Sequence, residues 1–161
     1  MSNITRQLRN LDVSRLRMKN GNTVEAELRK HARILWNCIM EEMDNSIYSA
    51  YTPKLYMRKL NLYHALRVND MIQVSVENMG LYVKLYFDED DVLHENFFGE
   101  KVNVAAILNE GYQTHGSFAD VPMLGWREAT NFIDNGILKY KQKVRNPFRV
   151  KLNINNEERI F

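Results

Sequence analysis

Residues 22–43 read NTVEAELRKHARILWNCIMEEM, and they carry the strongest structural signal in the chain. Apolar residues recur there at intervals of three and four, which is the spacing along one face of an α-helix. They are Val24, Leu28, Ala32, Leu35, Ile39 and Met43. Asn22 and Glu25 have the spacing of an N-cap pair, and Pro53 disfavours a helical residue before it. We predict one long helix from about residue 23 to residue 50.

Alternating apolar and polar residues predict strands on the C-terminal side of this helix. The alternating apolar residues are Ile72, Val74, Val76, Leu81, Val83, Leu85 and Phe87. Residues 77–80 separate the two runs and end in a glycine, which suits a hairpin loop. A third run, over residues 148–154, predicts a last strand that pairs with the hairpin. Each strand has one apolar face, so we expect the long helix to cover the sheet.

Two shorter helices are expected between the hairpin and the last strand. Residues 103–110 form the first, because they include a run of alanine, isoleucine and leucine and are followed by Gly111, a common residue just past a helix end. Pro122 suits the first turn of a helix. We predict that this second helix runs to about Asn135 and ends at Gly136.

The predicted fold class is therefore α+β, with a long amphipathic helix packed on a small antiparallel sheet. The hairpin and the C-terminal strand form the sheet, and one or two further short helices complete the fold. Residues 1–20 are expected to form an N-terminal arm or short helix, and residues 21–161 a single α+β domain. A chain of 161 residues, 45% of them hydrophobic, can bury a core without a metal or a disulfide.

Several classes of protein are disfavoured by composition. Cys38 is the one cysteine and cannot form an internal disulfide. No apolar run follows Met1, and no 18 apolar residues stand together, so we expect neither a secretory signal nor a membrane span. We expect a protein that is made in the cytoplasm and has no membrane partner.

Charge is unevenly distributed although the net charge is only +2. Residues 1–69 hold 12 Lys and Arg against 6 Asp and Glu, whereas residues 70–138 hold 3 against 12. Residues 139–161 are basic again, with 7 against 2. Such a chain either neutralises its charges internally or presents opposite signs on different faces, which suits contact between copies.

The residues that commonly perform catalysis or bind metals do not form a recognisable pattern. Neither His64 nor the other histidines stand at zinc-ligand spacing, and the acidic run from Asp88 lacks the glycine and glutamate of a calcium loop. The scattered glycines form no phosphate-binding loop. We expect no metal, no cofactor and no enzymatic activity.

Two sets of residues are candidates for catalysis. His31 and Cys38 lie seven residues apart on the predicted helix, but a cysteine on such a helix is usually a small buried apolar residue. A hydrolase or nuclease would draw on His94, Glu95, His115 and Asp120, whose spacing matches no known mechanism. We favour structural roles for both sets.

Residues 47–62 contain three tyrosines, a proline and an arginine within eleven positions. The pattern consists of Tyr48, Tyr51, Pro53, Tyr56, Arg58 and Leu62. With the pair Glu110-Gly111 and the helix start at Pro122, it resembles the siphophage neck and tail-completion proteins, also called minor tail components. The chain departs from that family at Tyr112, where threonine is frequent, and at Met123, where an aromatic residue is usual. The simpler reading is that these residues pack in the core.

The resemblance implies a structural virion protein of a tailed bacteriophage, located at the head–tail junction and assembled in the host cytoplasm. Its implied partners are further copies of itself, in a homo-oligomeric ring of six or twelve, together with the phage connector and tail-tube proteins. Passing contact with DNA in the channel is also implied. A tail terminator subunit is the alternative within this class.

Candidate interface residues follow from charge and from loop length. They are Asp88, Glu89, Asp90 and Asp91 in an acidic loop, Tyr112, His115 and Phe118 in a long polar loop, and Lys139, Lys141, Lys143 and Arg145 in the basic C-terminal part. That basic part also permits a different class of function, a nucleic-acid-binding accessory protein. A small antitoxin-like regulatory binder is a further alternative.

Overall fold

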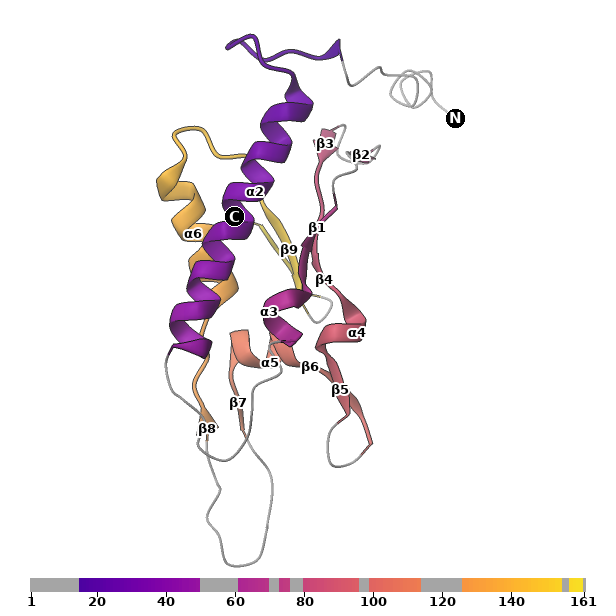
Figure 1. The fold of residues 1–161 in the computed structure, drawn as a ribbon, viewed down its shortest axis with the longest axis vertical. Coiled ribbons are helices and arrows are strands. Elements are labelled where there is room, and N and C mark those ends of the chain that lie inside the picture. The colour runs from indigo at the N-terminus through magenta and orange to yellow at the C-terminus, as the bar shows by residue number, and fades with distance from the viewer. Residues whose placement is uncertain are drawn as a thin grey trace, which may run out of the picture.

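A computed structural model describes residues 15–49, 61–69, 73–75, 80–95, 99–113, 126–154 and 157–160. The predicted α+β class is confirmed: helices and small antiparallel sheets alternate along the described chain (Figure 1). The long helix stands at the centre, with α6 on one side of it and the strands β1 and β4 on the other.

The long helix α2 runs from Val24 to Met43 and continues as a π-helical turn, η2, over Asp44–Tyr48. The predicted helix from 23 to 50 is thus confirmed. The predicted N-cap at Asn22 is wrong, because Thr23 takes that position and its hydroxyl accepts a hydrogen bond from the Ala26 N–H at 3.2 Å. The Asn22 side chain donates to Glu27 instead.

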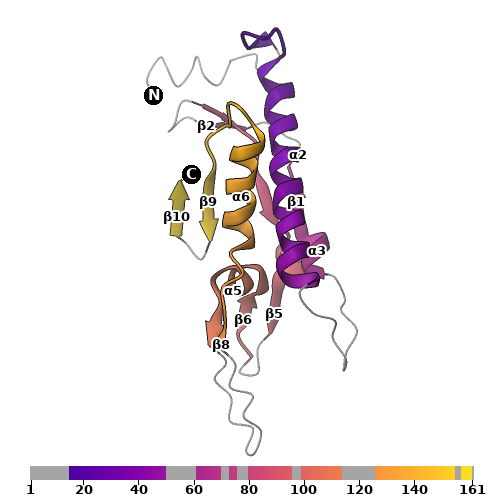
Figure 2. The same cartoon turned by 90° about the vertical axis from the view of Figure 1, so that its left-hand side faces the viewer.

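The core forms where α2 meets α6, which spans Phe132–Lys143 and runs antiparallel to α2 (Figure 2). Fully or nearly fully buried residues of both helices form its centre: Cys38, Ile39, Met43, Phe132, Ile133, Ile137 and Tyr140. Gly136 lies within this contact. A Cβ atom there would stand 2.7 Å from the Ile39 Cα, so the glycine allows the two helices to approach closely.

The prediction of a helix ending at Gly136 is wrong, because Gly136 lies inside α6 and serves packing rather than termination. The start of α6 is set by a distant residue. Asn109 is fully buried, and its Oδ1 accepts a hydrogen bond from the Ile133 N–H at 2.9 Å. The predicted start at Pro122 lies outside the described residues, and residues 126–127 form a strand.

The predicted hairpin exists but is longer and divided in two. Strand β2 (Gln73–Ser75) pairs with β3 (Gly80–Tyr82), and β1 (Leu66–Val68), which was not predicted, pairs with β4 (Leu85–Phe87). Four residues separate β1 from β2, whereas two separate β3 from β4, so the two ladders differ in register.

The long helix covers one part of this hairpin, as expected. Trp36 of α2 donates its indole N–H to the Leu66 carbonyl oxygen at 2.8 Å. Phe87 of β4 also meets Phe132 of α6, with 6.3 Å between the ring centroids. The strand β4 therefore lies against the core formed by both helices.

Short elements follow the hairpin. Helix α3 (Asn61–Ala65) precedes β1 and packs on α4 (Glu89–Val92). Strands β5 (Leu93–Glu95) and β6 (Lys101–Asn103) form a hairpin that was not predicted. Helix α5 (Val104–Glu110) confirms the predicted helix at 103–110.

The remaining strands correct two predictions. Strand β7 (Tyr112–Gln113) pairs with β8 (Trp126–Arg127), so Tyr112, which was predicted to lie in a long polar loop, belongs to a strand. Strand β9 (Lys151–Ile154) pairs with β10 (Glu157–Ile160) and not with the predicted hairpin. The strand pairs β5–β6 and β7–β8 extend past the C-terminal end of α2 (Figures 1 and 2).

Candidate interaction surfaces

The described part of the tyrosine-rich strip belongs to the core. Leu62 is 7% exposed and lies in the main apolar cluster, against which Tyr48 packs. The Tyr48 hydroxyl accepts a hydrogen bond from the Tyr63 N–H at 3.0 Å, and the two rings meet edge to face. These two residues therefore join the end of α2 to α3. The other strip residues, Tyr51, Pro53, Tyr56 and Arg58, lie outside the described residues.

Glu110 and Gly111 end α5, as predicted. Gly111 has a φ of 79°, a left-handed value that glycine adopts without strain. The change of direction sends the chain into β7, where the Tyr112 backbone pairs with Arg127. The pair Glu110-Gly111 is thus a turn between a helix and a strand. Pro122, His115 and Phe118 lie outside the described residues.

The acidic run at residues 88–91 was predicted to be a loop, and the structure makes it the start of α4. The Asp88 carboxylate caps this helix by accepting from the Asp90 N–H at 3.2 Å. Carboxylates in a first helical turn are stabilised by the exposed N–H groups there, which explains the helix. Arg67 of β1 binds Asp88 and Asp91 at 3.0 and 3.2 Å. Glu89 and Asp90 remain exposed.

Two of the four basic candidates are used inside the molecule. Lys139 of α6 lies 2.9 Å from the Glu42 carboxylate and 3.1 Å from that of Glu41, both on α2. Lys143 reaches Glu41 at 3.0 Å. Hydrogen bonds from Lys143 and Lys139 hold the pKa of Glu41 below its ordinary value. These lysines therefore help to align the two helices.

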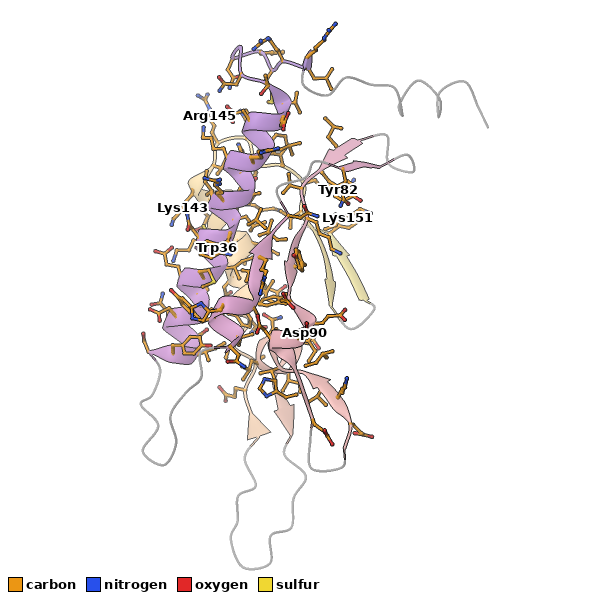
Figure 3. All side chains as sticks on the ribbon, turned by 45° about the vertical axis from the view of Figure 1, so that its right-hand side comes forward. Trp36, Tyr82, Asp90, Lys143, Arg145 and Lys151 are labelled. Atoms are coloured by element: carbon orange, nitrogen blue, oxygen red, sulfur yellow. The ribbon has the colours of Figure 1, made fainter. Side chains whose placement is uncertain are left out.

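The other two basic candidates, Lys141 and Arg145, are not paired in this way. No described carboxylate lies within ion-pair distance of either, and Arg145 is exposed. Figure 3 shows Arg145 level with the N-terminal half of α2, well away from Asp90. The predicted basic residues therefore divide into two groups. Lys139 and Lys143 bind α2, whereas Lys141 and Arg145 do not.

A partly buried polar network connects the chain after α6 to α2. The backbone N–H of Phe148 donates to the Tyr140 hydroxyl at 2.9 Å, and that hydroxyl lies 2.8 Å from His31 Nδ1. The other ring nitrogen of His31, Nε2, lies 3.7 Å from the Glu27 carboxylate. Burial lowers the pKa of His31, and the charge of Glu27 opposes that change in part.

Sequence reasoning did not identify Arg29, Lys30 and Arg33 as candidates, although they lie on α2 near His31. Arg29 and Lys30 have side chains 44% and 64% exposed, and Arg33 is also exposed. Their positions outside the apolar stripe of the helix were visible in the sequence. The contact of their neighbour His31 with Phe148 was not visible, because it depends on the antiparallel pairing of two distant helices.

The structure describes four of the six residues that were candidates for catalysis, namely His31, Cys38, His94 and Glu95. Cys38 is fully buried, and burial raises the pKa of its thiol, so it packs as an apolar residue. His94 and Glu95 are exposed on β5, and His115 and Asp120 lie outside the described residues. Within the described ranges, no three metal-binding side chains gather at one place. None of the described helices is long and apolar enough to cross a membrane.

These features define a small α+β protein with a two-helix core, short projecting strand pairs and strongly charged surfaces. A family model matches residues 6–150, and the chain therefore belongs to the YomN family. The family name is a phage-associated one of the SPbeta type, and the protein is accordingly phage-related. No curated protein and no solved structure matches the chain.

Proposed function

We propose that this phage-related protein is a structural virion subunit that forms a ring at the head–tail junction and completes the tail there. It acts through its interfaces and not by catalysis, and its partners are further copies of itself, the connector and the tail-tube protein. The resemblance of the tyrosine strip to neck and tail-completion proteins supports the proposal, and so does membership of a phage-associated family.

One observation of the structure carries the proposal. The described strands form five separate two-stranded sheets. Two-stranded pairs have little stability by themselves, and each presents backbone groups at its edges. In a ring, neighbouring copies would pack on these two-stranded sheets, and pairing between their strand edges would join the subunits. The pairs β5–β6 and β7–β8, which extend beyond the helical core, are suited to this role (Figure 1).

Opposite charges on separate surfaces favour a ring of this kind. Glu89 and Asp90 are exposed on α4, whereas Lys141 lies on α6. A ring is built from contacts between two different faces of each subunit, so one face must complement the other. Glu89 and Asp90 on α4 would form the acidic face, and Lys141 on α6 would belong to the basic face.

The first experiment measures the mass of the assembly by sedimentation and by native mass spectrometry, with and without the tail-tube protein of the same phage. A closed oligomer is expected, and a monomer under all these conditions would contradict the proposal. Loss of the gene should leave heads and tails unjoined. If tails of irregular length appeared instead, the alternative role of tail terminator would replace tail completion.

The second experiment reverses charge at the two surfaces. Lys141→Glu and Asp90→Lys should each prevent assembly, whereas an equal mixture of the two variants should restore it, because the changed faces complement each other. Glu128→Lys alters an exposed acid that lies on neither α4 nor α6 and serves as the matched control. Assembly by both single variants would exclude this pair of faces.

A further inference from the structure

The antiparallel arrangement of α2 and α6 brings two basic segments of the chain to one end of the molecule. The His31 and Phe148 rings meet with 4.6 Å between their centroids. His31 is flanked on α2 by arginine and lysine, and Phe148 lies between two arginines. The exposed cations that lie within four residues of one of these two rings in the sequence include Arg29, Lys30, Arg33, Arg145 and Arg149, and we call these five the basic end.

Few negative charges offset the basic end. Glu25 pairs with Arg29 at 2.7 Å. Glu27 is 6% exposed, accepts hydrogen bonds from Asn20 and Asn22, and lies 3.7 Å from the Lys30 ammonium group, so it offsets Lys30 in part. Among the described residues, no carboxylate pairs with Arg33, Arg145 or Arg149. The basic end thus presents unpaired guanidinium groups to solvent.

The acidic groups lie elsewhere. Asp88–Asp91 stand at α4, and Glu41 and Glu42 lie at the C-terminal end of α2, where lysines of α6 bind them. Figure 3 shows Asp90 well apart from Arg145. A polyanion is therefore attracted to the basic end and repelled by the carboxylates of α4, so we expect it to approach from the basic end.

We propose that the basic end binds the phosphate backbone of DNA without reading its sequence. Guanidinium groups match phosphate oxygens in geometry and charge, and several exposed arginines on one surface are the pattern of non-specific binding. A protein partner is less suited to this end, because protein interfaces centre on apolar and aromatic residues. Of the described large apolar residues that are exposed, Met18 precedes α2, and the others lie on α3, α6 and the strands. This inference does not depend on the junction role.

The experiment measures binding of the full chain to a fluorescent duplex DNA of arbitrary sequence over a series of salt concentrations. Arg33→Gln combined with Arg145→Gln removes two charges of the basic end. Lys84→Gln combined with Lys101→Gln is the matched control, because it removes two exposed lysines, one between β3 and β4 and one on β6. Thermal unfolding checks that all the variants fold.

Binding is expected at low salt, with an affinity that falls steeply as salt is added. The slope of log K against log salt should decrease by about 2 in the arginine variant, since each lost phosphate contact removes about 0.9. The lysine variant should keep the original slope. Absence of binding at low salt, or equal slopes in both variants, would overturn the inference. A changed oligomeric mass in the arginine variant without DNA binding would identify a protein contact and would overturn it as well.

Discussion

Gly136 of α6 lies directly against Ile39 of α2, and a Cβ atom added to the glycine would stand 2.7 Å from the Ile39 Cα. Real Cβ atoms are not found so close to a backbone atom, so a larger residue would push the two helices apart. Among the described elements, α2 and α6 form the most extensive contact, and these two residues lie within it. Its consequences can be tested by substitution.

Gly136→Ala should lower the free energy of unfolding by about 1–3 kcal/mol, because overpacking outweighs the gain of about 1 kcal/mol in helix propensity. Asn135→Ala, at the neighbouring exposed position of the same helix, should be neutral or slightly stabilising. Chemical denaturation of both variants measures the difference. Stabilisation by Gly136→Ala would show that the helices do not pack as described.

Asn109→Ala should destabilise the protein by about 2–3 kcal/mol, because it removes a helix cap and leaves buried groups unpaired. The Asn109 side chain accepts from the Ile133 N–H and donates to Asp134 at 3.0 Å. Asn131→Gly is the control. Asn131 has a φ of 50° and makes no side-chain cap, so glycine should be tolerated there. Denaturation midpoints that ranked these variants in the opposite order would refute the role of Asn109.

Acid should weaken the contact between α2 and the chain after α6. Burial lowers the pKa of His31 below its ordinary value, so the unfolded chain binds a proton more readily than the folded one. The contribution to stability is therefore complete above the ordinary pKa of about 6.5 and is lost as the pH falls below it. We expect the stability difference between the wild-type protein and His31→Gln to shrink from pH 7.5 to 5.5, as measured by thermal unfolding. A constant difference over this range would count against the prediction.

Lys139→Glu should lower the melting temperature, because it places a third carboxylate beside Glu41 and Glu42 on the facing helix. Hydrogen bonding to Glu42 and Glu41 raises the pKa of Lys139, so the lysine stays charged at neutral pH. The double variant Lys139→Glu with Glu42→Lys should recover part of the loss. Lys141→Glu, two positions along α6 and without an ion pair to α2, should leave the melting temperature unchanged. A double-mutant cycle without recovery would show that the ion pair does not align the helices.

The sequence predicted those helices and strands that depend on residues close together in the chain. The apolar stripe from Val24 to Met43 predicted α2, and Asn103 through Gly111 predicted α5, since a helical face and a terminating glycine are properties of neighbouring residues. The alternation around residues 72–87 likewise predicted the hairpin. The acidic run at 88–91 was misread, because a cap by Asp88 turned an expected loop into a short helix.

Tertiary structure decided what depends on residues far apart in the chain. Gly136 looked like a helix end in the sequence, and only its contact with Ile39 shows that it packs two helices together. The cap that Asn109 provides for α6 acts across 24 positions and leaves no local signal. The same pairing of helices gathers Arg33 and Arg145 at one end and directs Lys139 inward. The sequence determined how much charge the protein carries, whereas the antiparallel packing of α2 and α6 determined which charges face solvent.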